Sequence, residues 1–337
     1  MNRIMLPEGC KICERGGKLV LFVTGLCTDS CYYCPLSEKR RNKDVVYANE
    51  REVFSDHDVI EEAHLMDAEG TGITGGDPIL KLDRTIHYAS LLKNEFHNHH
   101  IHLYTSGTLC TDETFEELEN YIDEIRFHPQ KDWSIIEKAL NYDFDVGAEI
   151  PAIDKDYIER FVKYLEDIGA KFLNLNELEY SETNIEELRK RGFKFKENSA
   201  VKGSEEIALG IIEKYKDSDL IIHYCSSTFK DSVQLRERLK RRAKNVKKSY
   251  EEIEDCLIVR GVIDCFENID SVYNFILENV EISEDMMEKD YLQNKIYIHW
   301  FALSEIVDIL KKRKVKAGIV KEYPTYERKR MEYIPLV

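Results

Sequence analysis

The sequence predicts an α/β fold, a partial or full parallel (βα) barrel followed by a small C-terminal α+β domain. From Lys18 to about residue 225, short apolar runs alternate with amphipathic stretches of helical length, as parallel βα units require. After about Tyr250 this alternation ends, and the remaining apolar runs resemble strands of a smaller piece. At 337 residues the chain is long enough for one barrel and an appended domain.

Each element follows from a local pattern. KLVLFV is a continuous apolar run, typical of a strand buried on both faces, and the run at Thr71–Thr74 ends in a Gly-Gly-Asp-Pro turn signal. The expected barrel strands are Lys18–Val23, Thr71–Thr74, Ile101–Thr105, Glu124–Phe127, Val146–Ile150, Phe172–Leu175 and Leu220–Tyr224. The expected helices, with apolar residues at helical spacing, are Ser55–Met66, Leu82–Glu95, Glu113–Tyr121, Trp133–Asn141, Asp156–Leu165 and Ile207–Tyr215. Three later strands are expected at Leu257–Ile263, Lys295–Trp300 and Val315–Lys321. The expected divisions are an N-terminal segment (1–17), the barrel (18–250) and the C-terminal domain (251–337).

Composition restricts the cellular compartment and the class of protein. The formal net charge of −16 argues against a surface that broadly coats nucleic acid. No run of about 18 apolar residues is present, and the N-terminus MNRIMLPEGCK lacks the apolar region of a signal peptide. We therefore expect a cytoplasmic protein without a membrane span. In that compartment nine cysteines indicate metal binding rather than disulfides.

Three of these cysteines, Cys27, Cys31 and Cys34, form a C-x3-C-x2-C motif directly after the first expected strand. The Gly-Gly-Asp-Pro turn follows the second. Loops at the carboxyl ends of parallel strands meet at one edge, so we expect both segments to face one cavity. A structural zinc ion needs four ligands, whereas three thiolates on an iron–sulfur cube leave one iron open to another ligand. Structural zinc remains the alternative.

This motif, the strand before it, the Gly-Gly-Asp-Pro turn and the βα alternation resemble the radical S-adenosylmethionine (radical SAM) superfamily, and within it the activating-enzyme-like group. The resemblance covers roughly Lys18 to Cys225. It implies a [4Fe–4S] cluster on the three cysteines and SAM on the open iron. One electron from a ferredoxin- or flavodoxin-like donor would cleave SAM, and the resulting 5′-deoxyadenosyl radical would abstract hydrogen from a substrate.

The resemblance also implies roles for single residues. Tyr33 takes the place of the aromatic residue that packs near the adenine of SAM. Gly75 and Gly76 match the family's Gly-Gly-Glu turn, whose backbone carbonyls hold the SAM amino group, while Asp77 replaces the glutamate.

Further candidates lie at the ends of later strands. Ser106 is expected to contact SAM or substrate, and Glu149 suits the ribose hydroxyls because a carboxylate accepts hydrogen bonds from both. Asn174, Asn176 and Glu177 occupy positions where adenine or substrate is held, and His128 ends the fourth strand. For each of these residues, capping a helix or contacting water is the simpler alternative.

A second metal site is expected from the other cysteines. Cys10 and Cys13 form C-x2-C before the first strand, and Cys225 ends the seventh. Together they could hold zinc or an auxiliary iron–sulfur cluster. The alternative is a core cysteine, the expectation for Cys110, Cys256 and Cys265.

The sequence is compatible with several classes of substrate. Basic stretches at Arg236–Lys248 and at "EKRRNK" after the cysteine loop suggest an anionic partner such as tRNA, against the alternative of a solvated helix face. In the second stretch Lys39, Arg40, Arg41 and Lys43 are expected to rim the cavity. RNA, a protein and a small metabolite remain candidate substrates of an oxidoreductase or a transferase. The competing class is a non-catalytic, metal-stabilised RNA-binding or adaptor protein.

Overall fold

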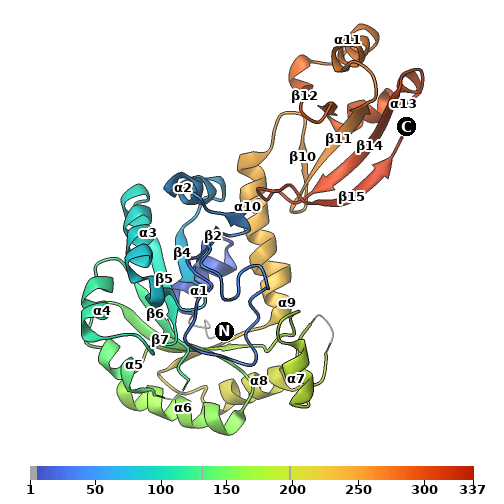
Figure 1. The fold of residues 1–337 in the computed structure, drawn as a ribbon. Coiled ribbons are helices and arrows are strands. Elements are labelled where there is room, and N and C mark those ends of the chain that lie inside the picture. Colours follow the sequence, from blue (N-terminus) through green and yellow to red (C-terminus); the bar gives the residue numbers. More distant parts are fainter. Residues whose placement is uncertain (1–5, 131, 197–198) are drawn as a thin grey trace. The chain divides into compact units, whose positions relative to one another are not determined.

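The computed structural model describes residues 6–130, 132–196 and 199–337, and divides into two compact units (Figure 1). The first unit ends at Leu235 and the second spans Arg236–Val337. This division lies closer to the N-terminus than the boundary expected after residue 250. Helix α10 (Arg236–Val246) groups with the second unit because it buries Leu239 and Ala243 and contacts strand β11 there.

A nine-stranded sheet forms the core of the first unit, counted over the described residues. Its order is β3-β2-β1-β4-β5-β6-β7-β8-β9. From β1 through β4 to β9 neighbouring strands are parallel, whereas β2 is antiparallel to both β1 and β3. The strands are β1 (Lys18–Phe22), β2 (Tyr47–Ala48), β3 (Arg51–Glu52), β4 (Gly70–Thr74), β5 (His100–Thr105), β6 (Glu124–Phe127), β7 (Asp145–Pro151), β8 (Phe172–Asn176) and β9 (Ile221–Cys225). Because β9 is one end of this order and the β2–β3 hairpin is the other, the barrel is partial.

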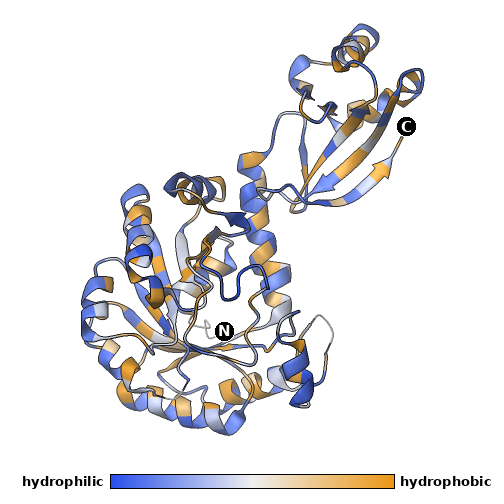
Figure 2. Ribbon diagram, in the orientation of Figure 1, coloured by the Kyte–Doolittle hydropathy of each residue, from blue (hydrophilic) through white to orange (hydrophobic). Residues whose placement is uncertain are grey.

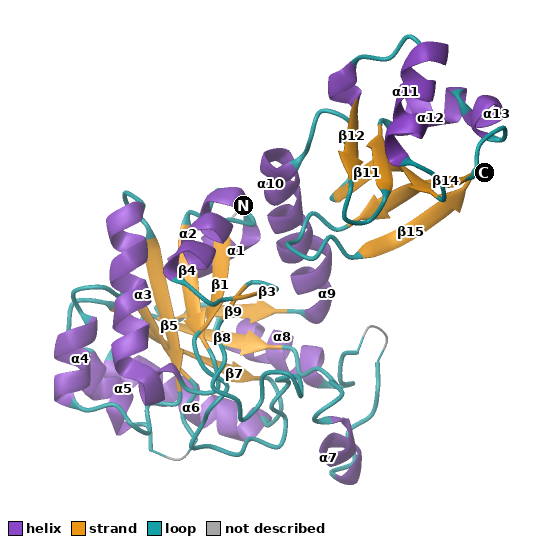
Figure 3. Ribbon diagram, turned by 45° about the horizontal axis from the view of Figure 1, so that its top comes forward, coloured by secondary structure: helices purple, strands orange, loops and turns teal. Residues whose placement is uncertain are grey.

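Helices cover the outer face of this sheet (Figures 1 and 3). They are α2 (Asp56–Leu65), α3 (Leu82–Glu95), α4 (Asp112–Leu118), α5 (Ser134–Ala139), α6 (Lys155–Ile168) and α8 (Ser204–Lys214). Helix α7 (Ile185–Lys190) lies away from this layer, where its Leu188 packs with Leu178, Tyr180 and Val201. Figure 2 shows hydrophilic and hydrophobic residues alternating along these ribbons, as expected for helices with one buried face. The main core lies between the helices and the strands, with Leu19, Leu103, Phe115, Ile125 and Phe161 fully buried. All seven expected barrel strands are present, displaced by at most one residue at either end.

The N-terminal C-x2-C segment forms a helix that the sequence did not predict, α1 (Glu8–Glu14). It contacts β1, β4 and β5 and the π-helix η2 (Lys230–Leu235), so it belongs to the first unit and is not a separate segment. At Gly9 the helix approaches the strands so closely that a Cβ atom would lie 2.7 Å from side-chain atoms of Arg126 and His102. Glycine therefore lets α1 pack against these two side chains.

The second unit contains a six-stranded antiparallel sheet in the described part of the chain. Its elements are β10 (Glu252–Glu254), β11 (Leu257–Cys265), α11 (Ile269–Asn279), β12 (Met287–Asp290), β13 (Lys295–Ile298), α12 (Trp300–Glu305), α13 (Val307–Leu310), β14 (Val315–Glu322) and β15 (Arg330–Pro335). The order β12-β13-β11-β14, with helices after β11 and β13, is the ferredoxin-like arrangement, to which β15 adds an edge strand. The expected α+β domain is thus confirmed, although the sequence indicated only β11, β13 and β14.

Among the described residues, none of the helices is both long and apolar enough to cross a lipid bilayer.

Buried histidines at the start of β5 should make the fold sensitive to acid. His99 is 2% exposed and His102 is fully buried. Burial lowers the pKa of His99 to about 4 and holds the pKa of His102 well below its ordinary value. Unfolding exposes both rings and returns their pKa values to about 6.5. The unfolded state then binds more protons, so stability is complete above about pH 6.5 and is lost as the pH falls toward 4.

We predict that the urea-derived unfolding free energy falls by up to about 1.4 kcal/mol per pH unit per histidine between pH 6.5 and 4.5. His99→Asn should flatten this profile, whereas the exposed His57→Asn should leave it unchanged. A wild-type profile that stays level over this range would contradict the prediction.

Candidate active site

One cavity of about 490 Å³ lies at the carboxyl ends of the parallel strands. Its wall collects residues from the loops that follow β1, β4, β5, β6, β7 and β8. The residues predicted from the sequence that line it are Cys27, Cys31, Tyr33, Cys34, Gly75, Gly76, Ser106, His128, Glu149, Asn176 and Glu177. The same cavity is also lined by Asp29, Gln130, Glu179 and Lys230, which were not predicted because they carry no motif.

The three cysteines occupy one irregular loop between β1 and β2. Cys27 is exposed, whereas Cys31 and Cys34 are half-buried. Partial burial raises the pKa of Cys27 and raises that of Cys31 to about 11, and the Asp29 carboxylate adds to the shift of Cys31. Iron binds thiolate, so metal loading must displace protons from these thiols. The backbone N–H of Asp29 lies 3.4 Å from the Cys27 sulfur, in a position to stabilise its charge.

The donor set fits a cluster better than a zinc ion. Within the described ranges, no three His, Cys, Asp or Glu side chains converge as ligands of one metal ion. A structural zinc would need such convergence, whereas the corners of a cube bind ligands through separate irons. Three thiols on one loop, all on the cavity wall, are compatible with the second arrangement.

Gly75 and Gly76 bring the turn after β4 against the loop that carries the cysteines. A Cβ atom at Gly75 would lie 2.4 Å from the carbonyl oxygen of Thr24, and one at Gly76 would lie 2.1 Å from that of Leu26. The Gly76 N–H donates to Thr24 and the Asp77 N–H to Leu26. Glycine is required at both positions mainly because the turn contacts the cysteine loop, whereas contact with a ligand was the reason expected from the sequence.

Asp77 does not line the cavity, contrary to the expected contact with cofactor. Its carboxylate is fully buried and accepts hydrogen bonds from the Thr105 hydroxyl (2.9 Å) and from the Ser106 N–H (3.1 Å) and hydroxyl (2.7 Å). It also caps the short helix that follows, by accepting from the Ile79 N–H. Asp77 therefore ties the glycine turn to the end of β5 and aligns Ser106 on the wall.

Tyr33 and His128 join the cysteine loop to β7. The His128 Nδ1 lies 2.8 Å from the backbone carbonyl of Glu149, and since a carbonyl only accepts, Nδ1 carries the proton. The Nε2 atom must then accept from the Tyr33 hydroxyl, 2.8 Å away. The phenol is thereby fixed on the cavity wall.

Glu149 is held by three donors in the barrel interior. Arg126 Nη1 lies 2.8 Å from Oε2, and Asn174 and Asn176 donate to Oε2 and Oε1 at 3.0 and 2.8 Å. Burial opposes ionisation, but the guanidinium and the two amides outweigh it and lower the pKa of Glu149 to about 2. Asn174 lies behind Glu149 rather than on the wall, so its predicted contact with adenine or substrate is replaced by this supporting role.

The cysteines of the expected second metal site do not converge as ligands of one ion within the described residues. The Cys10 sulfur instead lies 3.4 Å from Arg126 Nη2 and 3.3 Å from Asn174 Nδ2, while Gln234 approaches the Cys225 sulfur at 3.6 Å. Cys13 is buried in α1. A zinc ion on these cysteines is therefore not supported, and an auxiliary cluster stays a prediction.

The two basic stretches differ from expectation. Arg41 lines the cavity, but Arg40 stacks on Tyr47 with 4.2 Å between the guanidinium carbon and the ring centre, and donates to the Asn49 carbonyl. Lys39 and Lys43 are exposed. Within the second unit, cations of the Arg236–Lys248 stretch form ion pairs with Asp255, Glu237 and Glu288. These pairs favour the solvated-face alternative over an anion-binding patch.

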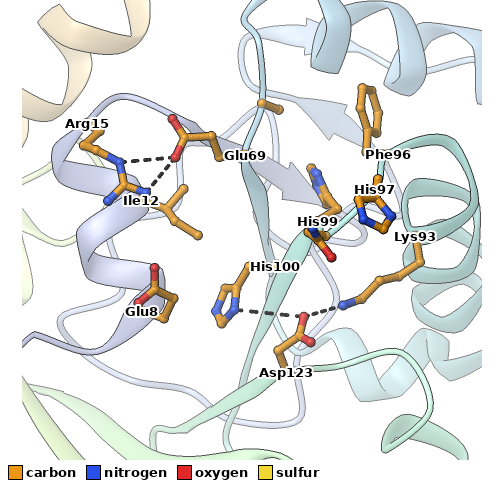
Figure 4. Close-up of a pocket in the computed structure, with 12 residues that line it drawn as sticks. Glu8, Ile12, Arg15, Glu69, Lys93, Phe96, His97, His99, His100 and Asp123 are labelled. Carbon is orange, nitrogen blue, oxygen red and sulfur yellow. Dashed lines mark hydrogen bonds and ion pairs between the residues drawn. The ribbon is translucent and has the colours of Figure 1, made fainter.

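A second hollow, of about 710 Å³, lies at the opposite ends of the strands (Figure 4). Its residues precede β4 and β5, and its charges are paired with one another, Arg15 with Glu69 and Lys93 with Asp123. In parallel α/β folds this amino-terminal side carries stability rather than chemistry. The larger hollow is thus not the candidate active site.

Comparison with known proteins gives the class and then the family of this chain. A radical SAM superfamily model matches residues 21–132, the segment that carries the three cysteines and the glycine turn. A putative glycyl-radical enzyme activating enzyme of Methanocaldococcus jannaschii is 45% identical over 98% of this chain and 93% of that protein. The chain belongs to the radical SAM superfamily and is an enzyme, so the non-catalytic alternative is set aside. The family uses a [4Fe–4S] cluster and SAM.

The other similarities are less informative. Residues 256–336 match a family described as Domain of unknown function (DUF8061). The SAM-bound structure of SuiB from Streptococcus suis is 12% identical with a TM-score of 0.43, covering 64% of this chain and 53% of SuiB. The anSMEcpe enzyme with bound AdoMet and Kp18Cys peptide is 16% identical with a TM-score of 0.41, covering 61% of this chain and 63% of that enzyme. The chain thus spans about half the length of SuiB, and both likenesses are remote.

We predict that Gly76→Ala destabilises the protein, because the added Cβ would overlap the Leu26 carbonyl and displace the loop that carries the cysteines. The unfolding free energy measured in urea should fall by about 1–3 kcal/mol, the usual cost of overpacking. Gly210→Ala is the matched control, since Gly210 lies within α8 with open space around its Cα. That change should stabilise the protein by up to about 1 kcal/mol through helix propensity. Equal effects of the two substitutions would refute the steric argument.

Proposed function

We propose that this protein is an activating-type radical SAM enzyme that abstracts a hydrogen atom from a protein substrate. The cofactors are a [4Fe–4S] cluster on Cys27, Cys31 and Cys34 and a SAM molecule in the same cavity. When bound, they supply a one-electron cleavage of SAM that generates the abstracting radical. The observation that carries the proposal is the gathering of all three thiols and the glycine turn on one cavity wall.

Different residues on the cavity wall have different proposed roles. The cysteine thiols, as thiolates, are the ligands of three irons and leave the fourth for SAM. Gly75 and Gly76 line the cavity, and their backbone carbonyls would be the acceptors for the SAM ammonium group. Ser106, whose hydroxyl donates to Asp77, presents its oxygen as a further acceptor for the methionine end.

The remaining contacts concern the nucleoside of SAM. Glu149 is ionised and keeps a fixed orientation, which suits a carboxylate that must accept from ribose hydroxyls. Asn176 supports it from β8. Tyr33, whose phenol is held by His128, presents an aromatic face for the adenine.

The choice of a protein substrate rests on the relative that is 45% identical, whose name is that of a glycyl-radical enzyme activating enzyme. By analogy the hydrogen donor is a glycine of a partner polypeptide. The partial barrel is compatible with this choice, because the sheet order ends at β9 and no strand pairing closes the barrel within the described residues. A ferredoxin- or flavodoxin-like protein is the electron donor, and Cys27, one of the proposed cluster ligands, is exposed.

We predict that the anaerobically reconstituted protein binds about four iron atoms per chain. Dithionite reduction should then yield 5′-deoxyadenosine and methionine from SAM. The triple change Cys27→Ala, Cys31→Ala, Cys34→Ala should lose both properties, since no thiolates remain to hold iron. Cys256→Ala, in the second unit, is the control and should retain them. An unchanged iron content in the triple variant would exclude this cluster site.

We keep the auxiliary cluster on Cys10, Cys13 and Cys225 as a separate prediction. If it exists, Cys10→Ala/Cys13→Ala should lose several irons per chain while SAM cleavage persists, because the two sets of ligands are distinct. Iron and zinc analysis of the purified variants decides this. A double variant with the full wild-type metal content would show that these thiols serve packing and the cage around Glu149.

A further inference from the structure

An ion pair forms part of the cavity wall at the open side of the barrel. Glu179 follows β8, and Lys230 begins the π-helix η2 that follows β9. The Lys230 Nζ lies 2.6 Å from the Glu179 Oε1, and the two side chains are 33% and 30% exposed. Both residues line the cavity. None of the roles assigned to the cluster or to SAM uses them.

The pair lies on a part of the wall distinct from the thiols and the glycine turn, beside Asn176 at the end of β8. The thiols, the glycine turn and Ser106 come from loops after β1, β4 and β5, whereas Glu179 and Lys230 come from segments after β8 and β9. Strand β9 is the open end of the sheet order.

The contribution of this ion pair to folding stability is too small to explain its presence. Partly exposed ion pairs contribute about 0–1 kcal/mol to folding. The lysine is also placed by a π-helix, a rare backbone form that occurs frequently at functional sites. Burial opposes the charge on Lys230, but nearby Cys225 and Glu179 outweigh it and raise the pKa of the lysine, so it stays a cation.

We propose that Lys230 and Glu179 bind the backbone of an extended polypeptide substrate, with the ammonium donating to a peptide carbonyl and the carboxylate accepting from a peptide N–H. In an extended chain, the N–H and C=O groups of one residue point to the same side, so one neighbouring donor and acceptor can engage both. Glycine has no side chain, and a site that selects a glycyl segment must therefore bind backbone. This inference rests on the proposed function and specifies how the polypeptide substrate is bound.

The test uses the reconstituted enzyme and a capped alanine peptide with one central glycine carrying deuterium at Cα. Equilibrium dialysis at up to millimolar peptide gives its affinity, and mass spectrometry gives deuterium transfer to 5′-deoxyadenosine. Lys230→Met and Glu179→Met should each weaken peptide binding about tenfold to a hundredfold, as expected for a lost hydrogen bond to a charged group. Lys214→Met removes a comparable ion pair with Glu159 away from the cavity and should bind the peptide normally.

An ester analogue separates recognition from a structural role. Replacing the N–H of the glycine by an ester oxygen removes the proposed donor to Glu179. The analogue should bind the wild type about tenfold more weakly than the amide, yet Glu179→Met should bind both equally, because its acceptor is already gone. A structural ion pair would give no such coupling.

The possible results distinguish a failure of this inference from a failure of the proposed function. Peptide binding that is unchanged in Lys230→Met and Glu179→Met, or absent in the wild type, would overturn the inference even if SAM is cleaved. If instead the wild type binds peptide through the pair but cleaves no SAM, the proposed function fails and the recognition element stands. Binding of a single-stranded RNA in place of the peptide, lost in the same variants, would also overturn the inference.

Discussion

The architecture of the site depends on the close approach of two backbones, the turn Gly75–Gly76 and the loop from Thr24 to Leu26. Two N–H donors from the turn bond to carbonyls of the loop, and no side chain fits between them. This contact fixes where the cysteine loop leaves β1. Asp77 extends the constraint to the end of β5 through four hydrogen bonds to Thr105 and Ser106. Three neighbouring loops are thereby held as one surface before any cofactor binds.

A second constraint is the charge buried inside the barrel. Arg126 is 3% exposed and lies between two carboxylates, Glu124 and Glu149. A buried charge that loses its partner costs about 3–5 kcal/mol, so these groups are strongly held in place. Helix α1 closes this network from outside, with the Gly9 N–H donating to Glu124 and the Cys10 thiol contacting Arg126. The N-terminal helix and the active-site carboxylate therefore share one set of contacts.

The sequence predicted those features that depend on local pattern. Short apolar runs alternating with stretches of helical length predicted all seven parallel strands, and the cysteine spacing with the glycine turn identified the cavity wall. Helix α1 was missed because seven residues with Gly9 inside carry no helical periodicity. The role of Asp77 was misjudged, since its partners Thr105 and Ser106 are distant in sequence. Glu179 and Lys230 belong to no motif and come together only when β8 and β9 pair.

The central claim is that the three thiols leave one iron open for SAM within this cavity. Electron–nuclear double resonance on the reduced protein, with SAM labelled by ¹⁵N at its amino group, tests it most directly. The account predicts a ¹⁵N hyperfine coupling to the cluster that is present in the wild type and in Cys256→Ala. A reduced cluster that shows no such coupling at saturating SAM would contradict it.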